Sequence, residues 1–167
     1  MADVVSGVER RLGRPVPANF IEDLRARKDA AYRRELKAID GVAAALDQIK
    51  GPVCVASSGP PDRIRLALEI TGLLPRFDGH IFSAYDINSW KPDPGLLLYA
   101  AKIMQVHPGD CAVIEDSVLG IQAARAANMR VWGFAATLEE VAPLAAAGAV
   151  IFRSMRELPA LLGARSE

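Results

Sequence analysis

The chain has 167 residues, 51% of them hydrophobic, which is enough for one well-packed domain with at most a small appendage. Twenty lysines and arginines balance 20 aspartates and glutamates, so no net charge attracts nucleic acid or a membrane surface. The sequence contains no apolar leader region and no apolar stretch of membrane-spanning length. We therefore expect a cytoplasmic protein without nucleic-acid or membrane partners.

The N-terminal part of the chain is rich in charge and has helical periodicity. Residues 1–37 predict two helices separated by a break at Pro15 to Pro17, with Arg33 and Arg34 on a solvated face. A more apolar helix is expected up to Ile49, with Asp40 as its N-cap.

After Gly51-Pro52, short β-branched runs alternate with segments of helical period, which is typical of parallel βαβ units. The expected strands are 53–56, 80–83, 111–114, 130–134 and 149–152. The expected helices are 61–70, 95–104, 119–127, 138–147 and 155–162, with Pro143 breaking or restarting the fourth. The sequence thus predicts a doubly wound, Rossmann-like α/β fold. Cys54 and Cys111 lie in apolar runs without zinc-type spacing, so both are expected to be buried, reduced thiols.

Polar residues follow three of the expected strands. Ser57 and Ser58 come directly after the first and offer hydroxyl and backbone N–H groups that suit a phosphate. The alternative is that they only cap the next helix.

Lys91 follows the second strand, and Pro92 and Pro94 restrict the backbone around it. A lysine held in this way offers a positive charge to a phosphate oxygen. A surface lysine before a proline-capped helix is the alternative.

Glu115 and Asp116 follow the third expected strand, and two adjacent, partly desolvated carboxylates need a counter-charge. Mg²⁺ takes one or two carboxylates together with waters and a substrate phosphate, which matches this pair. The alternative is that Asp116 or Ser117 only caps the following helix.

Taken in order, Val55-Ala56-Ser57-Ser58, Lys91-Pro92-Asp93-Pro94 and Glu115-Asp116-Ser117 with Gly120-Ile121 resemble the second, third and fourth motifs of the haloacid dehalogenase superfamily. The likeness covers about residues 38–153 and is greatest to the β-phosphoglucomutase and phosphoglycolate-phosphatase-like branch, whose members carry a helical cap. The resemblance implies a Mg²⁺-dependent phosphatase or phosphomutase of small phosphorylated metabolites. Residues 1–37 would be a remnant of the cap, and residues 38–167 the Rossmann-like core.

The resemblance also implies roles for individual residues. Ser57 would donate its hydroxyl to the transferring phosphoryl group, with the Ser58 N–H beside it, and Lys91 would neutralise the phosphate. Asp116 would ligate Mg²⁺ directly, and Glu115 directly or through water.

One family motif has no match in the sequence. The superfamily's first motif, Asp-x-Asp-Gly-Thr/Val, supplies the attacking aspartate, and Asp40-Gly41-Val42 fails to match it because position 38 is alanine. The chain is therefore expected to begin inside the cap, to lack the first core strand, and to be inactive by itself. In the family that strand lies between the strands expected at 53–56 and 111–114, so two sheet edges would be unpaired. The missing strand could come from elsewhere, the two strands could close up, or the fold could be marginally stable.

Two other functions are compatible with these motifs. One is a non-catalytic phosphate- or metal-binding module that self-associates through its open sheet edge. The other is a phosphoacceptor receiver domain, but receivers place the acidic pair first and the lysine last, whereas here the order is Ser57, Lys91, Glu115-Asp116.

Overall fold

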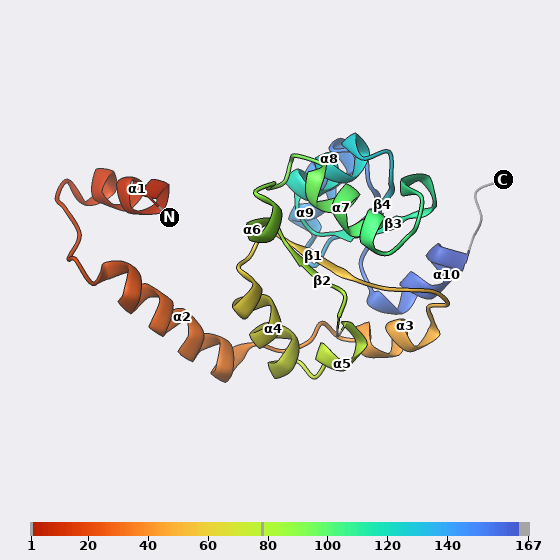
Figure 1. The fold of residues 1–167 in the computed structure, drawn as a ribbon, viewed down its shortest axis with the longest axis horizontal. Helices are drawn as coiled ribbons and strands as arrows, with labels where there is room; N and C mark the ends of the chain where they lie inside the picture. The colour runs from red at the N-terminus through yellow and green to blue at the C-terminus, as the bar shows by residue number, and fades with distance from the viewer. Residues whose placement is uncertain (1, 78, 164–167) are drawn as a thin grey trace. The chain divides into compact units, whose positions relative to one another are not determined.

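The computed structural model describes residues 2–77 and 79–163, and it divides the chain into two compact units, 1–37 and 38–167. The smaller unit consists of α1 (Ala2–Leu12) and α2 (Phe20–Glu35) (Figure 1). The two helices are separated by Gly13, which has a φ of +66°, and by the expected proline break. Helix α2 has no buried residue, and Arg33 and Arg34 are exposed in its last turn as predicted.

The larger unit alternates strands and helices, as expected. Its elements are α3 (Val42–Gln48), β1 (Val55–Ser57), α4 (Pro61–Ile70), α5 (Leu74–Phe77), β2 (Ile81–Ser83), α6 (Ala84–Ile87), α7 (Gly95–Ile103), η1 (Pro108–Asp110), β3 (Ala112–Glu115), α8 (Val118–Ala126), β4 (Arg130–Phe134), α9 (Leu138–Ala146), β5 (Val150–Phe152), η2 (Met155–Glu157) and α10 (Leu158–Gly163). All described strand pairs are parallel. The predicted α/β fold class is confirmed, and none of the described helices is long and apolar enough to cross a membrane.

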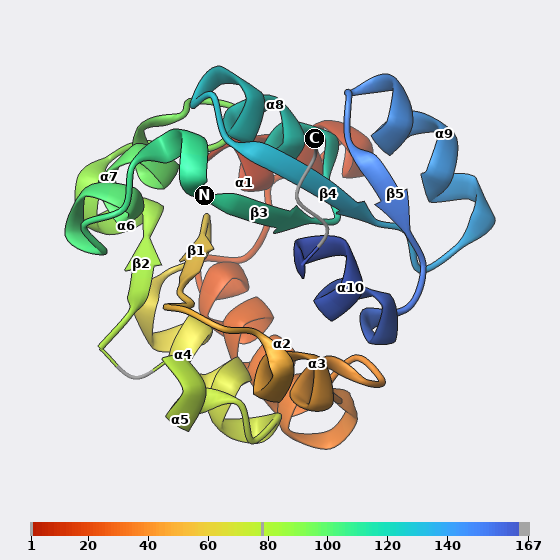
Figure 2. The same ribbon diagram turned by 90° about the vertical axis from the view of Figure 1, so that its right-hand side faces the viewer.

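The strands form two sheets rather than one. β1 pairs with β2, and β3, β4 and β5 form a second sheet in that order. Figure 2 shows β1 and β3 as the facing edges of the two sheets. Because no pairing joins these edges in the described chain, the two strands have not closed up on each other.

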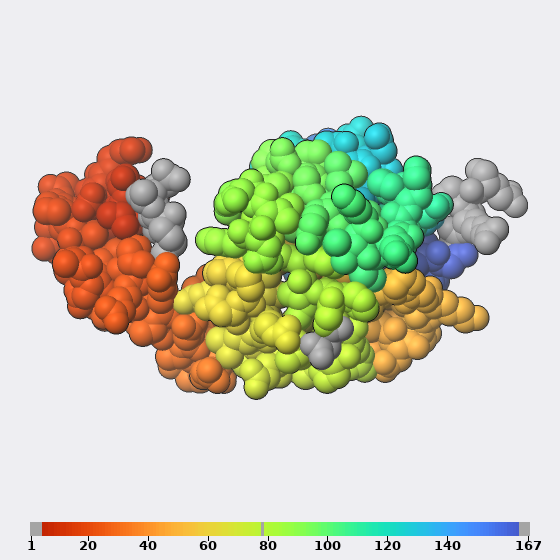
Figure 3. All heavy atoms as spheres, viewed as in Figure 1, coloured from red at the N-terminus to blue at the C-terminus, as the bar shows by residue number. Residues whose placement is uncertain are grey.

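Helices cover both faces of the three-stranded sheet. On one face Ile121 and Ala124 of α8 and Leu144 of α9 pack with Val131 of β4. On the other, Trp132 and Phe134 contact apolar residues of α3, η2 and α10. The alternation of Val131, Trp132 and Phe134 between faces follows the two-residue period of a strand. The segments from α4 to α7 fill most of the face of the larger unit shown in Figure 3.

Several local predictions need correction. The N-cap of α3 is Gly41, with a φ of +81°, and not Asp40, whose carboxylate instead accepts a hydrogen bond from Arg156 at 3.1 Å. Pro143 lies inside α9 without ending it. The capping box of Thr137 and Glu140 fixes the start of this helix.

Smaller differences concern helix bounds and the cysteines. The helix expected at 155–162 begins as the 3₁₀ turn η2 before continuing as α10, and the short helices α5 and α6 were not predicted. Cys54 and Cys111 are free thiols as expected, but they are only partly buried.

Candidate active site

The turn after β1 is shaped by its own serine. The hydroxyl oxygen of Ser57, the last residue of β1, accepts a hydrogen bond from the Gly59 N–H at 3.1 Å, while Ser58 is exposed. Pro60 occupies the N-cap of α4 and no side chain caps that helix. Neither serine is therefore a helix cap, and the turn presents a hydroxyl and backbone groups at the carboxyl end of the strand.

A buried serine that the sequence analysis missed braces this turn. Ser83 is the register partner of Ser57 at the end of β2 and is 1% exposed. Its hydroxyl donates to the Gly59 carbonyl at 2.7 Å and accepts from the Tyr85 N–H at 3.1 Å. The signal in the sequence was a serine at the end of an apolar strand, but its role depends on the β1–β2 register.

The loop that carries Lys91 is fixed on its far side by Asp93. One Asp93 oxygen accepts from the Ser89 hydroxyl at 2.6 Å and from the Gly95 N–H at 2.7 Å. These two hydrogen bonds, Ser89 first, lower the pKa of the Asp93 carboxyl below its usual 3.8. The loop thus leads directly into α7, with Pro94 at its N-cap.

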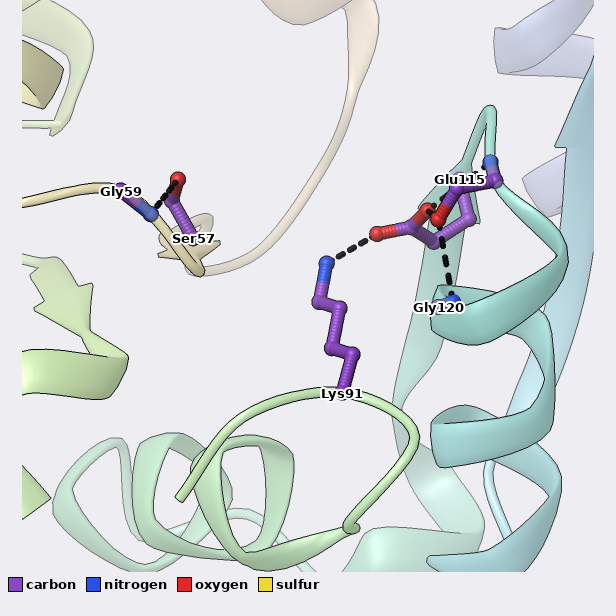
Figure 4. Close-up of polar contacts among 6 residues, drawn as sticks. Ser57, Gly59, Lys91, Glu115 and Gly120 are labelled. Carbon is purple, nitrogen blue, oxygen red and sulfur yellow. Dashed lines mark hydrogen bonds and ion pairs between the residues drawn. The ribbon is translucent and has the colours of Figure 1, made fainter. Parts of the chain in front are cut away.

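Lys91 forms an ion pair with Glu115, the last residue of β3 (Figure 4). The two side chains are 13% and 8% exposed. The other Glu115 oxygen accepts from the Ser117 N–H at 3.1 Å and from the Ser117 hydroxyl at 2.8 Å. Ser117 is also the N-cap of α8, because its hydroxyl oxygen accepts from the Gly120 N–H at 3.0 Å. The capping alternative for Ser117 is correct, and the same hydroxyl also orients Glu115.

Gly120 has a role that its place in the motif did not reveal. A Cβ atom built there would overlap the carboxyl group of Glu115, so only glycine lets α8 approach this carboxylate so closely. The glycine, the serine and the lysine together enclose the Glu115 side chain.

Glu115 and Asp116, the two carboxylates predicted to share a metal ion, have different surroundings in the structure. The counter-charge to buried Glu115 is Lys91, so this carboxylate does not need a metal ion to be neutralised. Asp116 is exposed at the strand end, where a hard cation could reach it. The described residues contain no group of three or more histidine, cysteine, aspartate or glutamate side chains placed to hold a metal ion. These residues fit a Mg²⁺ ion that is bound by one or two carboxylates and whose remaining ligands are waters and phosphate oxygens.

Of the residues predicted for the site, the structure brings Lys91 and Glu115 into direct contact. Ser57 lies at the end of β1 in the other sheet, and in Figure 4 its side chain is apart from the Lys91–Glu115 pair. Ser58 and Asp116 are exposed at their respective strand ends. The arrangement offers a hydroxyl, a lysine and a carboxylate pair at the carboxyl ends of two strands, the usual position of ligand sites in parallel α/β sheets.

Comparison with known proteins decides the family. Residues 7–128 match the family model of haloacid dehalogenase-like hydrolases. The chain belongs to this family. It is 37% identical over 141 residues to 6-phosphogluconate phosphatase of Escherichia coli, an alignment that covers 84% of this chain and 63% of that protein.

Solved structures of the same family agree with this assignment. A haloacid dehalogenase-like protein of Agrobacterium tumefaciens superposes with a TM-score of 0.84 at 34% identity, covering 97% of this chain and 76% of that one. A putative β-phosphoglucomutase of Thermotoga maritima has a TM-score of 0.84 at 25% identity, covering 97% and 77%. The present chain thus spans less than two thirds of the E. coli protein and about three quarters of these two structures.

Proposed function

We propose that this haloacid dehalogenase-like chain provides the phosphate- and metal-binding part of a Mg²⁺-dependent phosphohydrolase of small phosphorylated metabolites. The observation that carries the proposal is the buried Lys91–Glu115 pair, which fixes a lysine at the carboxyl end of β3 beside the exposed Asp116. The E. coli relative is named for a phosphorylated sugar acid, which supports a substrate of that size.

Each predicted site residue has a defined task in this proposal. The Ser57 hydroxyl and the Ser58 N–H bind oxygens of the phosphoryl group, and Lys91 neutralises part of its charge. Asp116 would hold Mg²⁺ directly, and Glu115, whose oxygens are already bonded to Lys91 and Ser117, would bind it directly or through water. Mg²⁺ bound there would neutralise charge on the phosphate.

The attacking carboxylate is not supplied by these residues, because the sequence contains no Asp-x-Asp motif. We therefore propose that the 167-residue chain binds phosphate but does not turn it over until a segment carrying that motif is added. Residues 1–37 are proposed as part of a helical cap, which contributes to substrate choice.

Calorimetry of the 167-residue chain with Mg²⁺ and inorganic phosphate tests the binding part. We expect Mg²⁺ binding that Asp116→Ala removes and phosphate binding that Ser57→Ala weakens. Glu139→Ala, an exposed acid of α9, is the matched control and should change neither. If the unmodified chain binds neither ligand, the proposal is wrong.

An aryl phosphate assay with Mg²⁺ tests the catalytic part. The chain alone should show no hydrolysis. A fusion that adds an apolar strand ending in Asp-x-Asp before residue 1 should hydrolyse the substrate. Robust turnover by the chain alone that Asp116→Ala abolishes would show that the nucleophile is already present.

The edges of β1 and β3 that have no pairing among the described residues favour a second candidate, a non-catalytic phosphate- or metal-binding module that self-associates through these edges. It predicts the same binding of Mg²⁺ and phosphate, but no turnover after the strand is added and a dimer in sedimentation experiments.

A further inference from the structure

Two serine hydroxyls hold Gly59, one from each strand of the two-stranded sheet. The Ser57 oxygen accepts a hydrogen bond from the Gly59 N–H at 3.1 Å (Figure 4), and the Ser83 hydroxyl donates to the Gly59 carbonyl at 2.7 Å. Ser57 and Ser83 are register partners in the parallel pair of β1 and β2, so their side chains leave the sheet on the same face. The peptide groups on both sides of Gly59 are therefore fixed by side chains.

The sequence of the turn after β1 limits the other ways of holding it. Pro60 and Pro61 follow Gly59 and carry no backbone N–H, and Pro60 occupies the N-cap of α4 without a side-chain cap. Gly59 itself has no side chain to pack against the core. The direction of the Ser57 hydroxyl and of the Ser58 N–H therefore depends largely on the two hydrogen bonds at Gly59.

The Ser83 hydroxyl is fully engaged inside the protein. The serine is 1% exposed, and its oxygen also accepts from the Tyr85 N–H at 3.1 Å at the start of α6. A hydroxyl has one proton to donate and two lone pairs that accept. Because the Gly59 carbonyl takes the proton of Ser83, this serine cannot donate to a phosphate itself. Any effect of Ser83 on phosphate has to pass through Gly59.

The bond from Gly59 also determines what the Ser57 hydroxyl can offer. The Gly59 N–H occupies a lone pair of the Ser57 oxygen, so the Ser57 proton is directed away from Gly59 and remains able to donate. A directed hydroxyl donor next to the exposed Ser58 suits the oxygens of an anion. The orientation of Gly59 thus decides whether the turn presents donors to a phosphate.

We propose that Ser83 is a positioning residue of the phosphate site. Acting through Gly59, it holds the Ser57 hydroxyl and the Ser58 N–H in the orientation that binds one phosphate group. The inference rests on the proposed function, because it requires that this turn binds phosphate. It adds to the site a residue of β2, a strand from which no site residue was predicted. A serine that only stabilised the sheet would affect unfolding without a selective effect on phosphate affinity.

Calorimetry of the folded 167-residue chain with inorganic phosphate and Mg²⁺ tests the proposal. Ser83→Ala should weaken phosphate binding about tenfold, because the turn loses the acceptor bond that orients it. The affinity for Mg²⁺ alone should stay unchanged, because Asp116 follows β3 in the other sheet. Equal phosphate affinities of the native chain and Ser83→Ala overturn the proposal. A parallel loss of Mg²⁺ affinity also overturns it, because the effect would then be a general loosening.

The matched control is Thr71→Val. The Thr71 hydroxyl donates to the Ala67 carbonyl at 2.7 Å, the same length as the bond from Ser83, but it lies at the C-cap of α4, the far end of the helix that follows the turn. The substitution removes a hydrogen bond of the same kind without touching Gly59, so phosphate affinity should not change. Comparable losses in the two variants would show that phosphate affinity follows stability alone and would overturn the proposal.

A double-mutant cycle shows whether Ser83 acts through the turn. In a Ser57→Ala background, Ser83→Ala should weaken phosphate binding by less than about threefold, because the hydroxyl that it positions is absent. An undiminished loss in that background overturns the proposal. A native chain that binds no phosphate contradicts the proposed function and the inference together, whereas native binding that Ser83→Ala leaves intact contradicts the inference alone.

Discussion

The two sheets of the larger unit differ in how firmly their strands are held. Central strand β4 is paired on both edges and four of its five residues are buried, whereas β1 is paired on one edge and none of its three residues is fully buried. The site is divided in the same way. The β3 end is fixed by bonds through Lys91, Glu115, Ser117 and Gly120, while the turn after β1 is held by the Gly59–Ser57 hydrogen bond and by buried Ser83 of β2.

This difference indicates which half of the site is held by its own side chains. The β3 half carries its own counter-charge and its own helix cap, so we expect its geometry to be independent of the β1 half. In the described chain β1 is paired on one edge only, so we expect the β1 half to open more readily.

The largest expected effect comes from breaking the buried ion pair. Lys91→Met leaves the Glu115 carboxylate buried without its counter-charge and should lower the free energy of unfolding by about 3 kcal/mol. Urea denaturation measures the change. The matched control is Arg76→Met, which breaks the surface pair with Asp47 and should cost under about 1 kcal/mol. Equal effects of the two variants would contradict the idea that the β3 half is held by its ion pair.

A pair of glycines compares the two strand ends directly. Gly120→Ala places a methyl group against the Glu115 carboxyl and should cost about 1–3 kcal/mol, despite the better helix propensity of alanine. In Gly59→Ala the new Cβ atom would lie 3.4 Å from the Ser57 hydroxyl oxygen, which is an ordinary contact. This substitution should therefore change the free energy of unfolding by less than about 0.5 kcal/mol. Thermal unfolding of the two variants side by side tests this, and a reversed order would show that the β1 turn is the tighter one.

The alternation of strands and helices could be read from the sequence because hydrophobic period and turn residues are local signals. The unpaired edges beside β1 and β3 could also be anticipated, since the missing motif belongs to the strand between them. The roles of individual side chains could not be predicted where they depend on residues far away in the sequence. Asp40 had the right residue type for a cap, but Arg156, 116 positions further on, binds its side chain. Ser83 and Gly120 likewise acquire their roles only when register and helix docking bring Gly59 and Glu115 beside them.

Removing the hydrogen bond from Ser83 of β2 to the turn after β1 should have a smaller effect on stability. Ser83→Ala removes the hydroxyl that donates to the Gly59 carbonyl and should cost about 1–2 kcal/mol, because the serine is 1% exposed. Because β1 is held less firmly than β4, the loss of this hydrogen bond should destabilise mainly β1. Hydrogen exchange should therefore speed up at Val55, whose N–H donates to the His80 carbonyl, while β4 amides stay protected. Equal acceleration in both sheets would mean that they open as one unit.

The smallest expected effect is a pH dependence in the loop that leads to α7. The Ser89 hydroxyl and the Gly95 N–H lower the pKa of Asp93 in the folded protein, so the unfolded chain binds the proton more tightly. The stability that this carboxylate contributes is therefore fully present above its unfolded pKa of about 3.8 and is lost as the pH falls through the lower, folded pKa. Asp93→Asn keeps an acceptor for Gly95 but cannot titrate. Urea midpoints of the two proteins should differ slightly at pH 6, with the native protein more stable, and should converge as the pH falls below 3.8. Because Asp93 is fully exposed the effect is small, and a gap between the midpoints that stays constant with pH would show that the turn does not depend on the charge of this carboxylate.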